Sequence, residues 1–198
     1  MTVVAQDAGL RADRTALEAL DDRGLVETCL AGRTEAFDLI VERHRRNVYR
    51  LCYRFAGRHE DAADLTQDVF LRAFKGLRSF RGDASLSTWL YRVGVNVCLN
   101  RVAAKAPPLD PLDTVPHLPA QVDDPSANLF RAERAARVRA AIGRLPRKQR
   151  ATLILRVYQE LSNQEIADVL GTTVGAVKAN VFHSLENLKK MLAKEDVR

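Results

Sequence analysis

The clearest structural signal in the chain is the segment LSNQEIADVLGTTVGAVKANVFHSLENL, which runs from Leu161 to Leu188. Ser162 is followed three residues later by Glu165, which is the spacing of a capping box at the start of a helix. Gly171 supplies a left-handed turn that most other residues resist, and Thr173 can cap a second, longer helix. The segment therefore predicts a helix-turn-helix, made of a short helix, a glycine turn and a longer helix.

The longer helix is predicted to have one buried and one exposed face. The buried stripe is expected to consist of Val174, Val177, Val181, Leu185 and Leu188. The other face suits the major groove, where a lysine reaches phosphates or guanine, a histidine donates to bases and a phenylalanine packs on thymine methyls. A solvated face or a hairpin for protein contacts is the alternative, but Phe182 beside Lys178 favours DNA. The residues predicted to bind double-stranded DNA are Thr173, Lys178, Ala179, Phe182 and His183.

A proline-rich stretch divides the chain. Six of the seven prolines lie between residues 107 and 125. Because proline removes backbone donors and disfavours helix in the residue before it, this stretch predicts a flexible linker. Apolar residues recur at helical spacing on both sides of it, and no alternating strand pattern appears. The sequence thus predicts an all-α protein of two small helical domains, with an acidic N-terminal tail at 1–21, a first domain at 22–105, the linker at 106–129 and a second domain at 130–194.

Charge is distributed in blocks along the chain. The net charge of +6 is made up mainly of +6 in residues 30–105 and +8 in residues 131–194, with −4 between them in residues 106–130. A charge that served solubility alone would not be expected to segregate in this way. Two basic blocks on either side of an acidic strip indicate two modules that face polyanions.

Composition limits the other classes of protein. The chain of 198 residues has no run of eighteen apolar residues and no basic-then-apolar start, so neither membrane insertion nor a signal peptide is expected. Cys29, Cys52 and Cys98 are an odd number of cysteines without metal spacing. We expect them to be reduced core residues of a cytoplasmic protein, with a redox-sensing thiol as the alternative.

An acidic helix is predicted in the first block, where residues 59–72 read HEDAADLTQDVFLR. The repulsion between Asp64 and Asp68, four residues apart, is partly compensated by the helix dipole. We interpret this face as a docking surface for a basic helix of a partner. An enzyme could use such carboxylates, but the chain lacks a companion histidine ligand, a glycine-rich phosphate loop and a nucleophile motif, so no catalytic residue, metal or cofactor is predicted. The predicted docking residues are Asp61, Asp64, Gln67, Asp68, Leu71 and Arg72.

A second constellation follows in residues 79–101, SFRGDASLSTWLYRVGVNVCLNR. A loop leads into a helix that carries the only tryptophan, and polar residues four apart form a ridge along that helix. Aromatic rings, cations and amides together suit single-stranded DNA, because rings stack on bases and cations hold phosphates. Burial of Trp89 in the core is the alternative interpretation. The residues predicted to bind the single strand are Phe80, Arg81, Ser87, Thr88, Trp89, Tyr91, Arg92, Asn96 and Asn100.

These motifs, in this order, resemble a known family. DLTQDVF at 64–70, SFRG at 79–82, TWLYR at 88–92 and VN at 95–96 closely resemble domain 2 of the extracytoplasmic-function (ECF) sigma factors of the bacterial sigma-70 family. Leu145-Pro146 and residues 161–188 resemble their domain 4. The resemblance covers roughly residues 22–105 and 130–192, and the order and spacing of several motifs make it specific.

The resemblance implies a transcription initiation factor that binds the β′ clamp and β subunits of core RNA polymerase. It further implies that the acidic helix docks on the β′ clamp, that the loop and the tryptophan helix capture a flipped base of the single-stranded −10 element near Asn96, and that the last helix reads the −35 duplex. An anti-sigma factor often holds family members inactive. Where relatives often carry arginines on the last helix, this chain has Lys178, Asn180 and His183, so the −35 sequence cannot be transferred from a relative.

Two other functions are open at this point. A stand-alone helix-turn-helix regulator would use the first block for dimerisation or sensing, and it would bind specific DNA without a polymerase. A nucleic-acid-processing enzyme would use the acidic cluster, and the isolated chain would show metal-dependent turnover.

Overall fold

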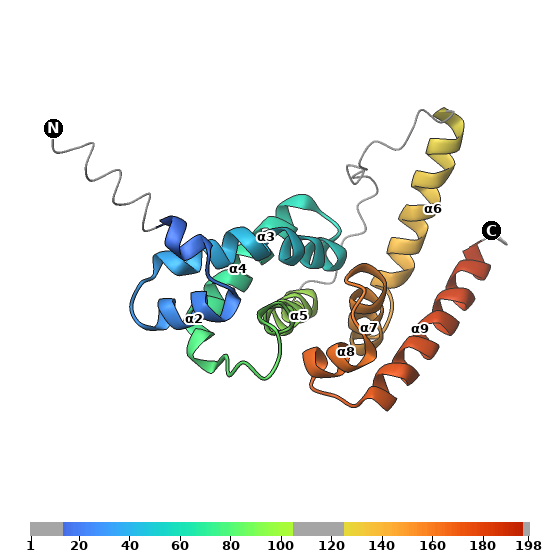
Figure 1. The fold of residues 1–198 in the computed structure, drawn as a ribbon. Coiled ribbons are helices and arrows are strands. Elements are labelled where there is room, and N and C mark those ends of the chain that lie inside the picture. The colour runs from blue at the N-terminus through green and yellow to red at the C-terminus, as the bar shows by residue number, and fades with distance from the viewer. Residues whose placement is uncertain (1–13, 105–124, 196–198) are drawn as a thin grey trace.

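The computed structural model describes residues 14–104 and 125–195, and within these ranges all the regular secondary structure is helical (Figure 1). The elements of the first domain are α2 (Asp22–Leu30), α3 (Glu35–Ala56), α4 (His59–Gly76), the 3-10 turn η1 (Leu77–Ser79) and α5 (Leu86–Ala104). Those of the second domain are α6 (Pro125–Gly143), α7 (Arg147–Tyr158), α8 (Asn163–Leu170) and α9 (Val174–Glu195). The predicted all-α fold with two helical domains is confirmed. The predicted proline-rich linker falls mostly outside the described residues.

The first domain is built around α3, α4 and α5, which pack against one another. Leu51, Val69 and Leu90, one from each helix, are fully or almost fully buried in its core. Gly94 lets α3 and α5 approach closely, because a Cβ at this position would lie only 2.9 Å from Cδ2 of Leu51. Gly57 ends α3 in the left-handed conformation, with φ of 77°.

The second domain contains the predicted helix-turn-helix. The Ser162 side chain accepts from the Glu165 amide, and the Glu165 side chain accepts from the Ser162 amide, so the predicted capping box is present. Gly171 ends α8 with φ of 59°, and the Thr173 hydroxyl accepts from the amide of Ala176 in the first turn of α9. The caps that the sequence predicted therefore position both helices of the motif.

One residue of the predicted apolar stripe on α9 was placed wrongly. Leu185 is 55% exposed, whereas Ser184 is fully buried and donates to the carbonyl of Gln149 on α7. Buried positions 177, 184 and 188 follow one another at intervals of seven and four residues, which keeps them on one face of a helix with 3.6 residues per turn. Leu185 lies just beyond the edge of that face.

The boundaries of two predicted segments differ from those in the structure. α6 begins at Pro125, so residues 125–129, which we expected in the linker, are helical. Proline suits the first position of a helix, where its missing amide is not needed. Residues 14–18 of the expected N-terminal tail form a helical turn, and Leu17 packs into the core of the first domain. None of the described helices is both long and apolar enough to cross a membrane.

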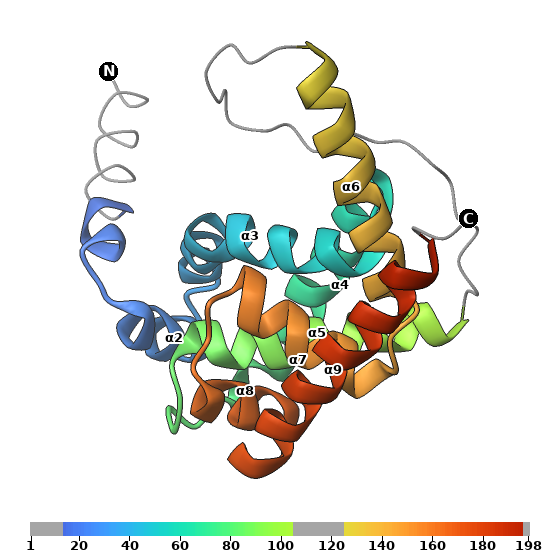
Figure 2. The same cartoon turned by 90° about the vertical axis from the view of Figure 1, so that its right-hand side faces the viewer.

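The two domains lie side by side. α8 packs against α5, and α7 packs against α3 (Figures 1 and 2). α9 lies on the side of the second domain that faces away from the first, so the helix-turn-helix has one helix at the domain contact and one at the outer surface.

Candidate nucleic-acid interface

The outer face of α9 presents the polar and aromatic residues that the sequence placed there. Lys178, Ala179 and His183 are exposed, and Phe182 is 60% exposed. The ring of His183 meets the ring of Phe182 edge-on, with 5.4 Å between centroids. Thr173 is exposed at the start of the helix, where its hydroxyl serves as the cap. The helix thus offers a cation, an imidazole and an apolar ring on one accessible surface.

The start of α5 is organised by Ser85, which the sequence analysis missed. Its Oγ accepts from the amide of Thr88 at 3.1 Å and lies 2.8 Å from the hydroxyls of Thr88 and Ser87. Thr88 is only 4% exposed, so this predicted DNA-binding side chain supports the helix start in this conformation. A serine directly before a helical stripe is the signal that could have identified the cap.

Two aromatic residues connect the preceding loop to α5. Phe80 and Trp89 are both partly buried, and their rings meet edge-on with 5.7 Å between centroids. Arg81 is exposed beside Gly82, whose φ of 77° turns the chain. The indole of Trp89 therefore packs on the core while part of it stays exposed, and its binding to DNA stays a prediction.

The polar ridge of α5 is present. Arg92, Asn96 and Asn100 are exposed along one side of the helix, while Tyr91 is buried beside them. The guanidinium of Arg92 does not point freely into solvent, because its Nε donates to the main-chain carbonyl of Asp168 on α8 at 3.1 Å. Burial raises the pKa of Tyr91, and the carboxylate of Glu165 on α8 raises it further, although Arg50 acts in the opposite direction.

The predicted docking face on α4 combines acids with exposed apolar side chains. Asp64, Gln67 and Arg72 are exposed, Asp61 and Asp68 are half-buried, and Leu71 is 59% exposed. Asp64 lies 4.0 Å from the guanidinium of Arg101 on α5. Phe74, which the sequence analysis missed, is also exposed and lies one turn after Leu71, with its ring edge-on to Phe37 at 5.0 Å. Its spacing of three residues from Leu71 is the signal that places both on one surface.

Both domains match models of one family. The model described as Sigma-70 region 2 matches residues 40–107, and the model described as Sigma-70, region 4 matches residues 135–188. The chain is 38% identical to the ECF RNA polymerase sigma factor SigM of Mycobacterium tuberculosis, over 86% of this chain and 84% of the relative. It is 32% identical to the RNA polymerase sigma-H factor of Pseudomonas aeruginosa, over 86% of this chain and 93% of the relative. The chain belongs to the ECF subfamily of the sigma-70 family.

A solved structure shares the fold of this sigma factor. The sigma factor RpoE of Bartonella quintana, solved in complex with the anti-sigma factor NepR, is 18% identical, with a TM-score of 0.61 and coverage of 79% of this chain and 96% of that one. Membership of the sigma family means that the chain is a transcription initiation factor.

The cysteines of this ECF sigma factor are buried in helices. Cys29, Cys52 and Cys98 are free thiols in the described part of the chain. Cys52 and Cys98 are in hydrogen-bond contact between α3 and α5, and this contact together with burial raises the pKa of Cys98. A thiol with a raised pKa stays protonated and behaves as a small core residue.

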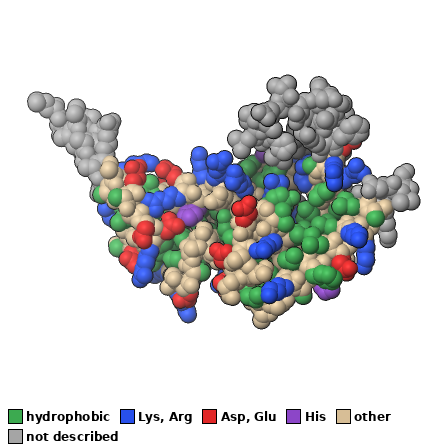
Figure 3. Space-filling view, turned by 45° about the vertical axis from the view of Figure 1, so that its right-hand side comes forward, with side chains coloured by type: hydrophobic (Ala, Val, Ile, Leu, Met, Phe, Trp, Pro, Cys, Tyr) green, Lys and Arg blue, Asp and Glu red, His purple; other side chains and the backbone are tan. Residues whose placement is uncertain are grey.

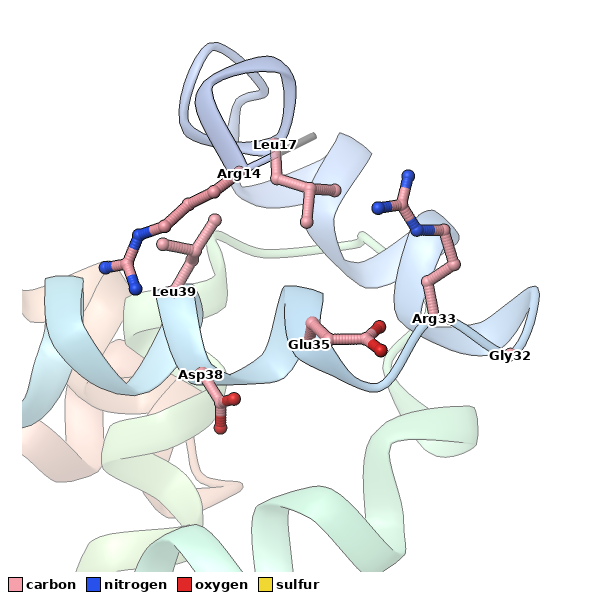
Figure 4. A pocket seen from close by; sticks show the side chains of 7 residues that line it. All are labelled: Arg14, Leu17, Gly32, Arg33, Glu35, Asp38 and Leu39. Atoms are coloured by element: carbon pink, nitrogen blue, oxygen red, sulfur yellow. The ribbon is translucent and has the colours of Figure 1, made fainter. Parts of the chain in front are cut away.

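A surface hollow of this sigma factor lies away from the predicted DNA-binding residues. Arg14 and Leu17 come from the N-terminal turn, Arg33 from the turn before α3, and Glu35 and Leu39 from α3 itself (Figure 4). Charges of both signs line it, and none of the residues predicted to bind DNA does. Lys and Arg side chains are instead spread over both domains with apolar side chains between them (Figure 3).

Proposed function

We propose that the chain binds core RNA polymerase and directs it to specific promoters, whose −35 element it reads as a duplex and whose −10 element it captures as a single strand. The observation that carries this proposal is the pairing of two separate polar surfaces, the outer face of α9 and the ridge of α5, on the two domains that match the sigma-70 models. Two surfaces on two domains suit two separated DNA elements.

For the −35 element, the proposed reader is the outer face of α9. Lys178 supplies a charge for phosphate or guanine, His183 a donor for a base, and Phe182 an apolar contact for a thymine methyl. Thr173 and Ala179 complete the proposed surface at the start of the helix. Contacts to phosphates give affinity that falls with salt, whereas contacts to base edges give the sequence preference.

For the −10 element, the proposed site is the loop before α5 and the ridge on that helix. Phe80 and Trp89 offer rings for stacking, Arg81 a cation for phosphate, and Asn96 an amide for a base edge. Capture of an unstacked base stabilises the opened strand, and this binding would promote strand opening. Asn100, Arg92, Ser87, Thr88 and Tyr91 are the remaining residues proposed for this site.

For the polymerase, the proposed contact is the face of α4. Leu71, 59% exposed, supplies an apolar anchor within a rim of acids, which suits a basic helical partner. Asp61, Asp64, Gln67, Asp68 and Arg72 form the rim. We infer that the partner surface belongs to the polymerase β′ clamp, that the chain works with the polymerase in the cytoplasm, and that an anti-sigma factor regulates it, as in the complex of the Bartonella relative.

Co-elution with core RNA polymerase on gel filtration, followed by transcription from mapped start sites, tests the proposal. Leu71→Arg should abolish co-elution, because it places a charge in the centre of the contact. Leu30→Arg is the matched control, since Leu30 is also exposed on the first domain but lies on α2, and it should co-elute normally. Failure of the unaltered chain to co-elute, together with specific DNA binding by the free chain, would instead support a stand-alone regulator.

A further inference from the structure

Two exposed cations at the end of α4 and in the turn after it have no role in the structure itself. Lys75 lies in the last turn of α4 and Arg78 in η1. Neither side chain has an ion pair or a hydrogen bond to any residue that the structure describes. Elsewhere in the domain, exposed arginines do bind carboxylates, as Arg23 binds Glu27 at 3.0 Å. Lys75 and Arg78 are therefore available to a partner.

The turn that carries these cations is held in place by its own contacts. Leu77 is 2% exposed and anchors η1 in the core. The hydroxyl of Ser79 donates to the carbonyl of Gly76 at 2.7 Å, and the amide of Phe80 donates to the carbonyl of Leu77 at 3.0 Å. Residues three apart are neighbours on an α-helix and eclipsed in a 3-10 turn, so the spacing of positions 75 and 78 keeps both cations on one surface.

This surface adjoins the aromatic rings of the proposed −10 site. The indole of Trp89 reaches the end of α4, because a Cβ added to Gly76 would lie 3.9 Å from its Cζ2. Gly76 stands between the two cations in the chain, and the ring of Phe80 meets the indole edge-on. The loop that joins η1 to α5 lies at the lower edge of the first domain in Figure 1. A strand stacked on these rings would therefore pass close to both cations.

The sign of the charge changes along the exposed side of α4. Asp64 and Asp68 belong to the acidic face proposed for the polymerase, and Lys75 follows Asp68 by seven residues. A helix dipole favours acids at the start and cations in the last turn, which accounts for Lys75 but not for Arg78 beyond the helix. A basic partner that suits the acids would be repelled by these cations. The basic end of the surface suits a polyanion instead.

The position of the cations also indicates which part of the strand they would meet. The polar ridge of α5 runs from the start of the helix to Asn100 near its end, from which the chain continues to the second domain. That domain is proposed to read the −35 element, which lies upstream of the −10 element. Lys75 and Arg78 lie at the opposite end of α5, beside Trp89. They therefore face the downstream side of the captured bases.

We propose that Lys75 and Arg78 form a phosphate path, which holds the nontemplate single strand directly downstream of the captured −10 bases. Cations bind phosphates without reading bases, so the path adds affinity and favours the opened strand but adds no sequence preference. Its place relative to the −10 element rests on the proposed function, whereas its affinity for single-stranded DNA does not.

The salt dependence of single-strand binding tests the path in the full chain. The probe is a labelled oligothymidine, measured by fluorescence anisotropy between about 50 and 200 mM salt. The double variant Lys75→Gln/Arg78→Gln should lower the slope of log affinity against log salt by about 1.4, since each phosphate contact on a single strand contributes ~0.7. Lys75→Arg/Arg78→Lys keeps both charges and should keep the slope. Circular dichroism verifies that the variants are folded.

Arg45→Gln/Arg46→Gln is the matched control, because it removes the same charge from exposed positions on α3 of the same domain. Its slope should stay close to that of the unaltered chain. The path is rejected if both double glutamine variants have the same slope, or if the unaltered chain does not bind oligothymidine.

A cleavage experiment tests where the path lies on a promoter. The native cysteines are buried, so an iron chelate attached after Arg78→Cys would modify the exposed position selectively. In a complex with core polymerase and a promoter, it should cleave the nontemplate strand downstream of the −10 element, whereas Asn100→Cys should cleave upstream. Cleavage from position 78 on the upstream side would reject the path. Failure to form the polymerase complex would contradict the proposed function, and the salt slopes would still decide on the path.

Discussion

Arg92 of α5 donates through Nε to the main-chain carbonyl of Asp168 in α8, at 3.1 Å, and thereby links two segments that are 76 residues apart in the chain. The acceptor lies three residues before the glycine that ends the first helix of the helix-turn-helix. A residue proposed to hold the −10 strand is therefore bound to the domain proposed to read the −35 element. Its substitution should affect the free chain and the polymerase complex differently.

Arg92→Ala should give effects of opposite sign in two assays. In the free chain, loss of the bond to Asp168 should increase the radius of gyration, because one hydrogen bond between the two domains is gone. In the polymerase complex, loss of the same cation should slow promoter opening several-fold, because a contact to the strand is gone. Small-angle scattering of the free chain measures the first effect, and permanganate reactivity of the promoter in the polymerase complex measures the second. A fall in promoter opening without any expansion of the free chain would show that this bond does not hold the domains together.

Asn96→Ala should reduce promoter opening more than polymerase binding. The side chain is exposed on the ridge of α5, and loss of one base contact should slow opening about tenfold. Asn47→Ala, at an exposed position on α3, is the control for the same substitution in the same domain. Permanganate reactivity reports opening, and gel filtration reports polymerase binding. Equal loss of both would remove Asn96 from the base-reading role.

Gly171→Ala should destabilise the second domain by ~1–2 kcal/mol, because a residue with a Cβ is strained at its φ of 59°. Gly143→Ala is the control: no positive φ occurs there, and nothing lies within 4 Å of the added Cβ. It should be neutral or slightly stabilising, since alanine favours helix over glycine. Denaturant unfolding followed by circular dichroism compares the two variants. Equal stabilities would show that the turn tolerates a side chain.

The parts of the fold that the sequence predicted are those with local signals. The capping box of Ser162 and Glu165 and the turn at Gly171 depend on residues within one helical turn, so spacing alone is informative. The prediction for Leu185 was wrong because this residue lies at the edge of the apolar stripe, where helical spacing is a weak signal of burial. An apolar side chain at the edge of a helical stripe can be buried or exposed, and for α9 the packing against α7 determines which.

The contacts between the domains were not predicted, because no local pattern encodes them. Arg150 on α7 donates to the main-chain carbonyl of Phe55 on α3, which lies 95 residues away in the chain, and this bond depends on how two complete domains meet. The only available signal was an arginine one turn before the buried Ile154 on α7, which puts a charge on an apolar face. The burial of Thr88 and Tyr91 has the same origin, since their exposure depends on packing that the helical period leaves open.

The capping box should make the second domain sensitive to acid. The hydrogen bonds from Ser162 lower the pKa of Glu165 below its ordinary value of 4.5. A carboxylate with a depressed folded-state pKa stabilises the fold above the unfolded-state value and loses this contribution as pH falls through the folded-state value. Glu165→Gln should therefore be less stable than the unaltered chain near neutral pH, and the difference should shrink below about pH 4.5. Thermal unfolding of both proteins across this pH range measures the difference in stability. A difference independent of pH would contradict the role of the charge.

His183→Ala should change the base preference at the −35 element while leaving general DNA affinity nearly intact. The imidazole is exposed on the outer face of α9 and its ring rests against Phe182, which orients it. Loss of a donor to one base should reduce discrimination at one position by ~1–3 kcal/mol. Lys178→Ala is the informative comparison, because loss of a phosphate contact should weaken binding to all sequences and reduce its salt dependence. Polymerase complexes of both variants should be measured against a set of promoters that differ at single −35 positions. A uniform loss of affinity in His183→Ala, like that expected of Lys178→Ala, would assign His183 to the backbone and not to a base.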